Sequence, residues 1–150
     1  MIYTVTLNPC IDKMYYIEKL NIGLVNRSIS SRIDLSGKGI NVSLLLSVLG
    51  EKSIALGFMG DKNLKEYKEH LKNYSVENKF VEFSGNTRTN TKIVDKSDGL
   101  QTDVSEQGLP VTEKEISELK NLIRKEIKEN DIVVFSGSVP LGLEFDEIGR

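Results

Sequence analysis

The segment SGKGINVS carries the most direct chemical signal in this sequence. Gly37 and Gly39 flank Lys38 and precede an aliphatic stretch over 40–49, which is typical of a helix buried on most of its faces. The backbone N–H groups of a first helical turn lack intrahelical partners, so they can bind an anion or a hydroxyl. Asn41 interrupts the apolar run with an amide that either caps the helix or holds another hydroxyl. The glycines either admit a ligand close to the backbone or form only a tight turn.

Charged side chains in other stretches could meet the same ligand. Asp12 follows the first apolar strand, where its carboxylate either accepts hydrogen bonds from sugar hydroxyls or stabilises a turn. In the extended segment TRTNTK, the side chains of Arg88, Asn90 and Lys92 point to one face. Such a face is either solvated or reads a phosphate or sugar, and arginine suits phosphate through its bidentate fork. Arg27 could point to the same space.

A third group of candidate contacts is the turn SGSVPLG, in which Ser138 and free backbone N–H groups follow a short apolar strand. Other chemistries lack the residues they need. No cluster has metal-ligand spacing, so no metal site is expected. Cys10 has no histidine nearby in the sequence, which disfavours nucleophilic catalysis. The glycine spacing matches neither a P-loop nor a complete G-x-G-x-x-G motif, because Val42 stands at the third position.

Composition limits the possible partners. A chain of 150 residues with 39% hydrophobic and 28% charged residues fits one packed domain. The net charge of −2 argues against nucleic acid as a partner. No secretory leader and no apolar run of membrane-spanning length is apparent, so no membrane partner is expected. A single cysteine suits a reducing, cytoplasmic location.

Strand and helix signals alternate along the chain. Continuous apolar strands are expected over 2–8, 53–58 and 131–137, and helices over 40–49, 64–74 and 112–127. This order predicts an α/β fold with a parallel sheet and helices on both faces. Two regions of alternating polarity, about 13–35 and 87–106, do not fit that layer. We expect them to form a small separate β-sheet that acts as a lid over the carboxyl ends of the parallel strands.

Six stretches in order resemble one known family: TLNPCID, SGKGINVS, LGFMGD, TRTNTK, DGLQTDVSEQG and SGSVPLG. Together they are similar to the N-terminal half of the ribokinase-like sugar kinases of the phosphofructokinase-B group. Within that group the chain resembles the 1-phosphofructokinases and tagatose-6-phosphate kinases most. The resemblance implies ATP- and Mg²⁺-dependent phosphorylation of a ketohexose phosphate, with fructose 1-phosphate as the first candidate and tagatose 6-phosphate as the alternative. It also implies that the lid can serve as a contact in a homodimer.

The resemblance further implies roles for individual residues. Asp12 would bind sugar hydroxyls, and the Gly37–Gly39 backbone with Asn41 would complete that cradle. Arg88 would hold the phosphate already on the substrate, with Arg27 and Ser138 as additional candidates. Lys38 lies in the motif without a defined role. Three positions depart from the family pattern, namely Ser36 for glycine, Val139 for leucine and Cys10 for alanine or serine.

Family members are about twice this length, and their second half carries an Asn-x-x-Glu motif and a Gly-Ala-Gly-Asp motif with the catalytic base. Neither motif occurs in these 150 residues. We therefore expect residues 1–150 to be the sugar-binding portion, without the nucleotide-binding half, without a catalytic residue, and inactive alone. The alternatives are a non-catalytic sugar-phosphate-binding protein, a structural α/β module without a ligand, and a ribose or nucleoside kinase.

Overall fold

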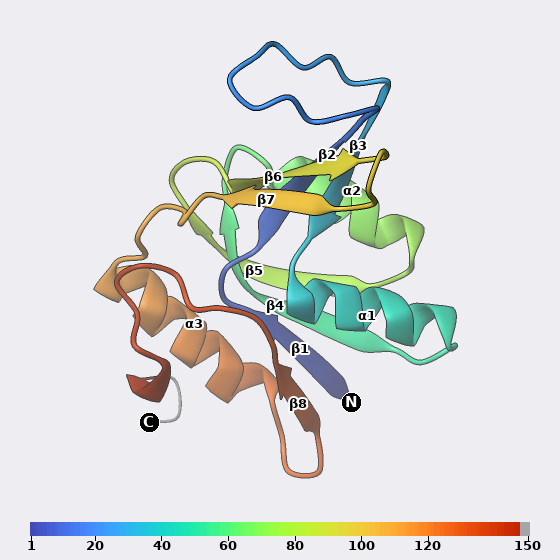
Figure 1. The fold of residues 1–150 in the computed structure, drawn as a ribbon. Helices are drawn as coiled ribbons and strands as arrows, with labels where there is room; N and C mark the ends of the chain where they lie inside the picture. Colours follow the sequence, from blue (N-terminus) through green and yellow to red (C-terminus); the bar gives the residue numbers. More distant parts are fainter. Residues whose placement is uncertain (148–150) are drawn as a thin grey trace.

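The computed structural model describes residues 1–147, which form two four-stranded sheets with helices packed around one of them (Figure 1). The first sheet is parallel throughout, with strand order β5-β4-β1-β8. Its strands are β1 Ile2–Thr6, β4 Ser53–Gly60, β5 Glu77–Phe83 and β8 Ile132–Phe135. β4 is buried along its whole length, as expected for a strand covered on both sides.

Helices cover both faces of the parallel sheet, as predicted. On one face, α1 Lys38–Val48 and α2 Leu64–Asn73 pack through Ile40 and Tyr67 against Ala55 and Met59 of β4. On the other face, α3 Glu113–Glu126 packs through Leu119 against a cluster that includes Leu56 of β4. Alternate side chains of a strand point to opposite faces, so β4 supplies both halves of the core.

The second sheet stands above the carboxyl ends of the parallel strands and has the order β3-β2-β6-β7 (Figure 1). Its strands are β2 Cys10–Ile17, β3 Ser30–Ser36, β6 Arg88–Asp95 and β7 Gln101–Ser105. The β2–β3 and β6–β7 pairs are antiparallel, whereas β2 and β6 run parallel in the centre. This sheet is the predicted lid, and its two halves come from the two sequence regions that were assigned to it.

The lid begins earlier than expected. β2 starts at Cys10 rather than near residue 13, because Cys10 and Ile11 already pair with Ser36 and Leu35 of β3. Asp12 therefore lies within a strand of the lid sheet and not in a loop after β1. The strand β5 was not predicted at all. It lies at the sheet edge and exposes charged side chains between its apolar ones, which weakens the periodic signal.

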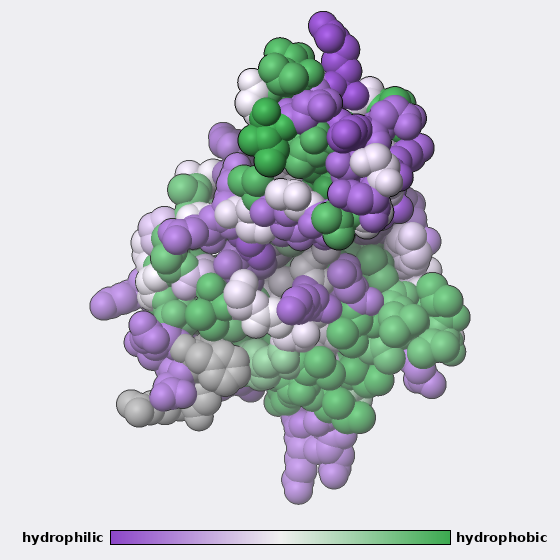
Figure 2. Space-filling view, in the orientation of Figure 1, coloured by the Kyte–Doolittle hydropathy of each residue, from purple (hydrophilic) through white to green (hydrophobic). Residues whose placement is uncertain are grey.

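Helix α1 is less buried than its aliphatic sequence indicates. Ile40 and Ser43 are buried, but Leu45, Val48 and Leu49 are 60%, 72% and 67% exposed. The helix packs with one side on β1 and β4, and the described residues cover little of its other side. Apolar surface is visible over this helix in Figure 2. The expectation of a helix buried on most of its faces is therefore wrong.

The C-terminal segment adds a short 3-10 turn, Phe145–Glu147. Within residues 1–147, no helix is long and apolar enough to cross a membrane.

Candidate functional site

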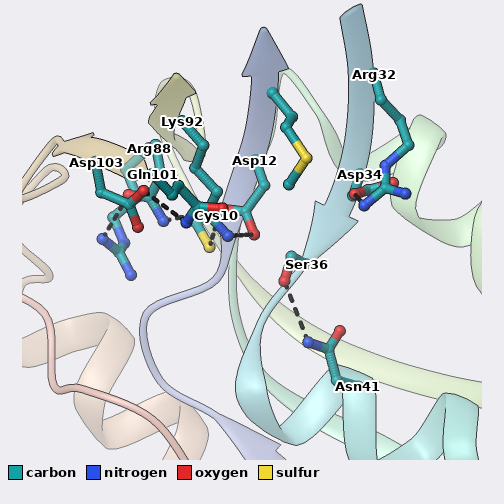
Figure 3. Close-up of polar contacts among 12 residues, drawn as sticks. Cys10, Asp12, Arg32, Asp34, Ser36, Asn41, Arg88, Lys92, Gln101 and Asp103 are labelled. Carbon is teal, nitrogen blue, oxygen red and sulfur yellow. Dashed lines mark hydrogen bonds and ion pairs between the residues drawn. The ribbon is translucent and has the colours of Figure 1, made fainter. Parts of the chain in front are cut away.

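The carboxylate of Asp12 is the best-defined polar group of the site. Asp12 is only 8% exposed and projects from β2 on the lid face shared with Lys92 (Figure 3). Lys92 Nζ lies 2.8 Å from Asp12 Oδ2, and Asn90 Nδ2 donates to Asp12 Oδ1 at 3.0 Å. The Cys10 thiol donates to the same Oδ1 at 3.6 Å. A near-buried carboxylate is thus surrounded by donors, as its burial requires.

Arg88 is connected to this group of side chains by hydrogen bonds. Its Nη1 donates to Asn90 Oδ1 and to the Glu106 carbonyl, each at 3.1 Å. Its Nη2 donates to the Asn8 carbonyl at 3.4 Å. Its Nε is buried and has no hydrogen-bond acceptor among the described residues. These contacts orient the guanidinium without using all five of its donors, so it retains capacity for an anion.

The start of α1 packs tightly on the end of β1. A Cβ at Gly39 would lie 2.6 Å from Thr6 Oγ1 and 2.9 Å from the Val5 carbonyl oxygen. The Ile40 N–H donates to Thr6 Oγ1 at 2.9 Å. Among the described residues, the N–H groups of Lys38 and Gly39 have no acceptor. The predicted N–H donors of the first helical turn are therefore present, and the glycines allow the backbone to lie there.

Asn41 and Asp12 line the same hollow between the lid and the helices. This hollow has a volume of about 420 Å³, and its lining includes Ser36 and Lys92. Asn41 is exposed, and its Nδ2 donates to Ser36 Oγ at 3.3 Å (Figure 3). The serine that departs from the family pattern thus orients the amide that follows it.

The remaining predicted site residues are less closely associated. Arg88 lines a separate hollow of about 510 Å³, and Asn90 connects it to Asp12. Ser138 is exposed and accepts a hydrogen bond from Asn8 Nδ2 at 3.3 Å, which places it near the Arg88 side of the site. Lys38 is exposed. Arg27 is also exposed in the β2–β3 loop, and no hydrogen bond or ion pair joins it to the others.

The electrostatics of the site favour an ionised Asp12. Burial on its own raises the pKa of the Asp12 carboxyl, but hydrogen bonds from Lys92 and Asn90 outweigh it and hold that pKa below its usual range. The hydrogen bond to Asp12 raises the pKa of Lys92. Burial, together with the Asp12 charge, raises the pKa of the Cys10 thiol, which keeps it protonated. Asp12 therefore acts as a hydrogen-bond acceptor near neutral pH.

Comparison with known proteins identifies the family of the chain. The sequence profile of the pfkB family of carbohydrate kinases matches residues 5–146 of this chain. The chain belongs to the pfkB family of carbohydrate kinases. It spans about half the length of the curated relatives that it matches.

Three relatives illustrate the similarity. Tagatose-6-phosphate kinase of Staphylococcus epidermidis is 37% identical, over 97% of this chain and 46% of the relative. 1-Phosphofructokinase of Bacillus subtilis is also 37% identical, over 97% and 47%. The structure of phosphofructokinase-2 from Escherichia coli, in complex with substrates and products, superimposes with a TM-score of 0.90 at 26% identity. That match covers 98% of this chain and 48% of the phosphofructokinase-2 chain.

Some contributors to the site were not identified from the sequence. Asn8, the last residue of the strand expected over 2–8, was given no individual role, yet its carbonyl and amide contact Arg88 and Ser138. Thr6 was not singled out, although its hydroxyl accepts from the first turn of α1. The sequence feature that could have identified Thr6 and Asn8 is their position. Both lie at the carboxyl end of a buried parallel strand, where ligand sites of α/β sheets form.

Proposed function

We propose that this chain binds a phosphorylated ketohexose as the sugar-binding part of an ATP-dependent kinase, with fructose 1-phosphate as the first candidate substrate. The kinase would transfer a phosphoryl group from ATP to a hydroxyl of the sugar. Membership of the carbohydrate kinase family supports this reaction class. The chain carries no Gly-Ala-Gly-Asp motif, so we place no catalytic base in it and expect it to be inactive alone.

One observation carries the proposal. The Asp12 carboxylate can accept hydrogen bonds from hydroxyls, and the Arg88 guanidinium can donate hydrogen bonds to a phosphate. The side-chain amide of Asn90 contacts both groups. A phosphorylated sugar carries hydroxyls that donate hydrogen bonds and, a few atoms away, a phosphate that accepts them. One such ligand can therefore contact Asp12 with its hydroxyls and Arg88 with its phosphate. The N–H groups of Lys38 and Gly39, which have no acceptor within residues 1–147, and the amide of Asn41 add contacts for further hydroxyls.

Tagatose 6-phosphate is the second candidate substrate. It is an isomeric ketohexose phosphate, and one of the relatives described above is named for its phosphorylation. A single arginine and a single carboxylate recognise features that both sugars share. The motif resemblance does not separate the two sugars, so side-by-side binding of fructose 1-phosphate and tagatose 6-phosphate decides their order.

ATP and Mg²⁺ are implied by the family, but the described residues offer little to hold them. Within residues 1–147, no three histidine, cysteine or acidic side chains gather as they would around a metal ion. We therefore assign no residue of this chain to Mg²⁺ and derive no step through it. The contribution proposed here is to bind and orient the sugar phosphate.

A homodimer through the lid is a further part of the proposal. The lid face opposite Asp12 exposes apolar side chains, including Ile33 at 63% and Val104 at 61%. The β2–β3 loop adds Ile22, Leu24 and Val25, each more than 70% exposed. Exposed apolar surface of this kind marks interaction sites. Oligomers occur among the structural relatives, since the inhibited form of phosphofructokinase-2 from Escherichia coli is described as tetrameric.

Calorimetric titration of the chain tests the proposal. We expect saturable binding of fructose 1-phosphate or tagatose 6-phosphate, and much weaker binding of unphosphorylated fructose. Arg88→Met should weaken sugar-phosphate binding by about tenfold to a hundredfold, because a charged hydrogen-bond donor is lost. Lys13→Met is the control, since Lys13 is also a cationic side chain of the lid but lies on the face opposite Asp12. Absence of sugar-phosphate binding, or equal binding by both variants, would contradict the proposal.

A non-catalytic sugar-phosphate-binding protein is the alternative of another class. It would share the same cradle and pass the binding test, so a turnover assay of the full-length protein with ATP separates the two. A ligand-free structural module would fail both measurements. A ribose or nucleoside kinase would bind its unphosphorylated substrate and tolerate Arg88→Met.

A further inference from the structure

We infer that Asn90 and Lys92 are positioning residues, which together hold the Asp12 carboxylate in one orientation toward the hollow between the lid and α1. This inference rests on the proposed function, in which Asp12 binds the hydroxyls of a sugar phosphate. It adds the two residues of β6 that determine where that carboxylate lies and which of its oxygens remains available.

The strand register brings both residues to Asp12. β2 and β6 run parallel, with Asp12 opposite Asn90 and Met14 opposite Lys92. Because side chains two apart on a strand share a face, Asn90 and Lys92 project on the same side as Asp12. The lysine side chain reaches back along the strand to Asp12 Oδ2, while the shorter asparagine contacts Oδ1 directly.

The two carboxylate oxygens are not equally occupied. Oδ1 accepts from Asn90 Nδ2 and from the Cys10 thiol, whereas within residues 1–147 Oδ2 accepts only from Lys92. A carboxylate offers about two acceptor sites per oxygen. Oδ2 therefore keeps an acceptor site for a ligand hydroxyl. The Lys92 ammonium has three donors, and Asp12 is its one hydrogen-bond partner among the described residues, so it keeps donors for a ligand.

Asn90 also fixes Asp12 relative to Arg88. Its Oδ1 accepts from Arg88 Nη1 at 3.1 Å while its Nδ2 donates to Asp12 Oδ1 at 3.0 Å. Reversing the amide would direct its NH₂ group at the guanidinium and its oxygen at the carboxylate, which loses both hydrogen bonds. The Asn90 amide therefore has one favourable orientation. In that orientation it fixes the distance between the Asp12 carboxylate and the Arg88 guanidinium, which contact the two ends of the ligand.

Lys92 supplies the charge that balances Asp12 inside the site. The Asp12 side chain is 11% exposed and that of Lys92 is 22% exposed. Arg32 of β3 lines the same hollow, but its guanidinium pairs with Asp34 at 2.8 Å and makes no ion pair with Asp12 among the described residues. Removing the ammonium leaves a largely buried carboxylate with only neutral donors, which favours its protonation or displacement.

The test compares Lys92→Met with Lys92→Arg, using Lys13→Met as the matched control. Lys13 is next to Asp12 in β2, on the opposite lid face, and makes no hydrogen bond or ion pair among the described residues. We expect Lys92→Met to weaken fructose 1-phosphate binding by about tenfold or more. Lys92→Arg should restore affinity to within about threefold of the parent, and Lys13→Met should leave it unchanged. Asn90→Leu should resemble Lys92→Met.

Two further measurements separate positioning from general destabilisation. Inorganic phosphate, followed by NMR, probes the Arg88 side alone, and Lys92→Met should bind it like the parent. The ¹³C signal of the Asp12 carboxyl should shift in Lys92→Met and recover in Lys92→Arg.

If the parent binds no sugar phosphate, the proposed function and this inference are both contradicted. If the parent binds the sugar phosphate and Lys92→Met binds it equally well, only the inference is contradicted. If Lys92→Met loses phosphate and sugar phosphate together, a general structural role replaces positioning.

Discussion

The hydroxyl of Tyr67 in α2 lies 2.6 Å from the Cys10 carbonyl oxygen and 3.1 Å from that of Ser36. Cys10 and Ser36 face each other at the base of the β2–β3 pair, where the lid joins the core. Tyr67 is fully buried, and burial, as the main cause, raises the pKa of its hydroxyl, so it is protonated and can donate. One core side chain therefore holds the base of the lid two residues from Asp12.

Tyr67→Phe should lower the free energy of unfolding by about 1–3 kcal/mol, because two buried carbonyls lose their shared donor. Urea unfolding followed by circular dichroism measures the change. Tyr74→Phe is the control, since Tyr74 is 39% exposed and its hydroxyl makes no described hydrogen bond. Equal stability of the two variants would show that the Tyr67 hydroxyl does not hold the lid base.

Gly39→Ala tests the close approach of α1 to β1. Alanine is normally preferred over glycine within a helix by about 0.5–1 kcal/mol, and Gly39 has no unusual φ angle. Crowding reverses this expectation, because the added Cβ would lie 2.6 Å from Thr6 Oγ1. We expect destabilisation by about 1–3 kcal/mol and weaker sugar-phosphate binding, measured by thermal unfolding and calorimetry.

Gly99→Ala is the comparison for that variant. Gly99 has a φ of +74° with open space around it, so its substitution costs only the local backbone strain of about 1 kcal/mol. Gly99→Ala should leave sugar-phosphate binding unchanged. A stabilised Gly39→Ala variant would show that the first turn of α1 can move away from β1 at little cost.

Local signals made several elements predictable from the sequence. Thr112 and Glu115 form the capping box expected of them, because both partners lie within one turn. The alternation in TRTNTK placed Arg88, Asn90 and Lys92 on one face, as the lid strand shows. In each case the information lies within a few residues of the feature that it determines.

Features that depend on distant residues were not predictable in the same way. The contact between Asn90 and Asp12 spans 78 positions and depends on the parallel register of β2 and β6. The aliphatic sequence of α1 has no polar side, so its pattern could not show that Leu45 and Val48 would remain exposed. Strand β5 mixes charged and apolar residues at a sheet edge, and only its pairing with β4 identifies it.

The Asp12–Lys92 ion pair should make the stability of the chain depend on pH in a defined way. The folded pKa of Asp12 is lowered, so its contribution is present above the unfolded value of about 3.9 and is lost as pH falls through the folded pKa. The folded pKa of Lys92 is raised, so its contribution is present below about 10.4 and is lost as pH rises through the folded pKa.

The stability difference between the parent and Lys92→Met should therefore be largest between these limits. It should narrow below about pH 4 and above about pH 10.5. Urea unfolding at a series of pH values measures it, and Lys13→Met should show no comparable window. A difference that is constant from pH 3 to pH 11 would mean that Lys92 stabilises through its aliphatic stem and not through its charge.

Self-association through the lid should be sensitive to charge on its outer face. Ile33 and Val104 project on the side opposite Asp34 and Asp103, and each is more than 60% exposed. Introducing like charges there, as Ile33→Glu with Val104→Glu, should convert a dimer to a monomer, because two copies would have to bury carboxylates without partners. Sedimentation velocity measures the change. Val48→Glu on exposed α1 is the control and should leave the dimer intact. Dissociation by Val48→Glu, with the lid variant still dimeric, would place the contact on the helical face of the core.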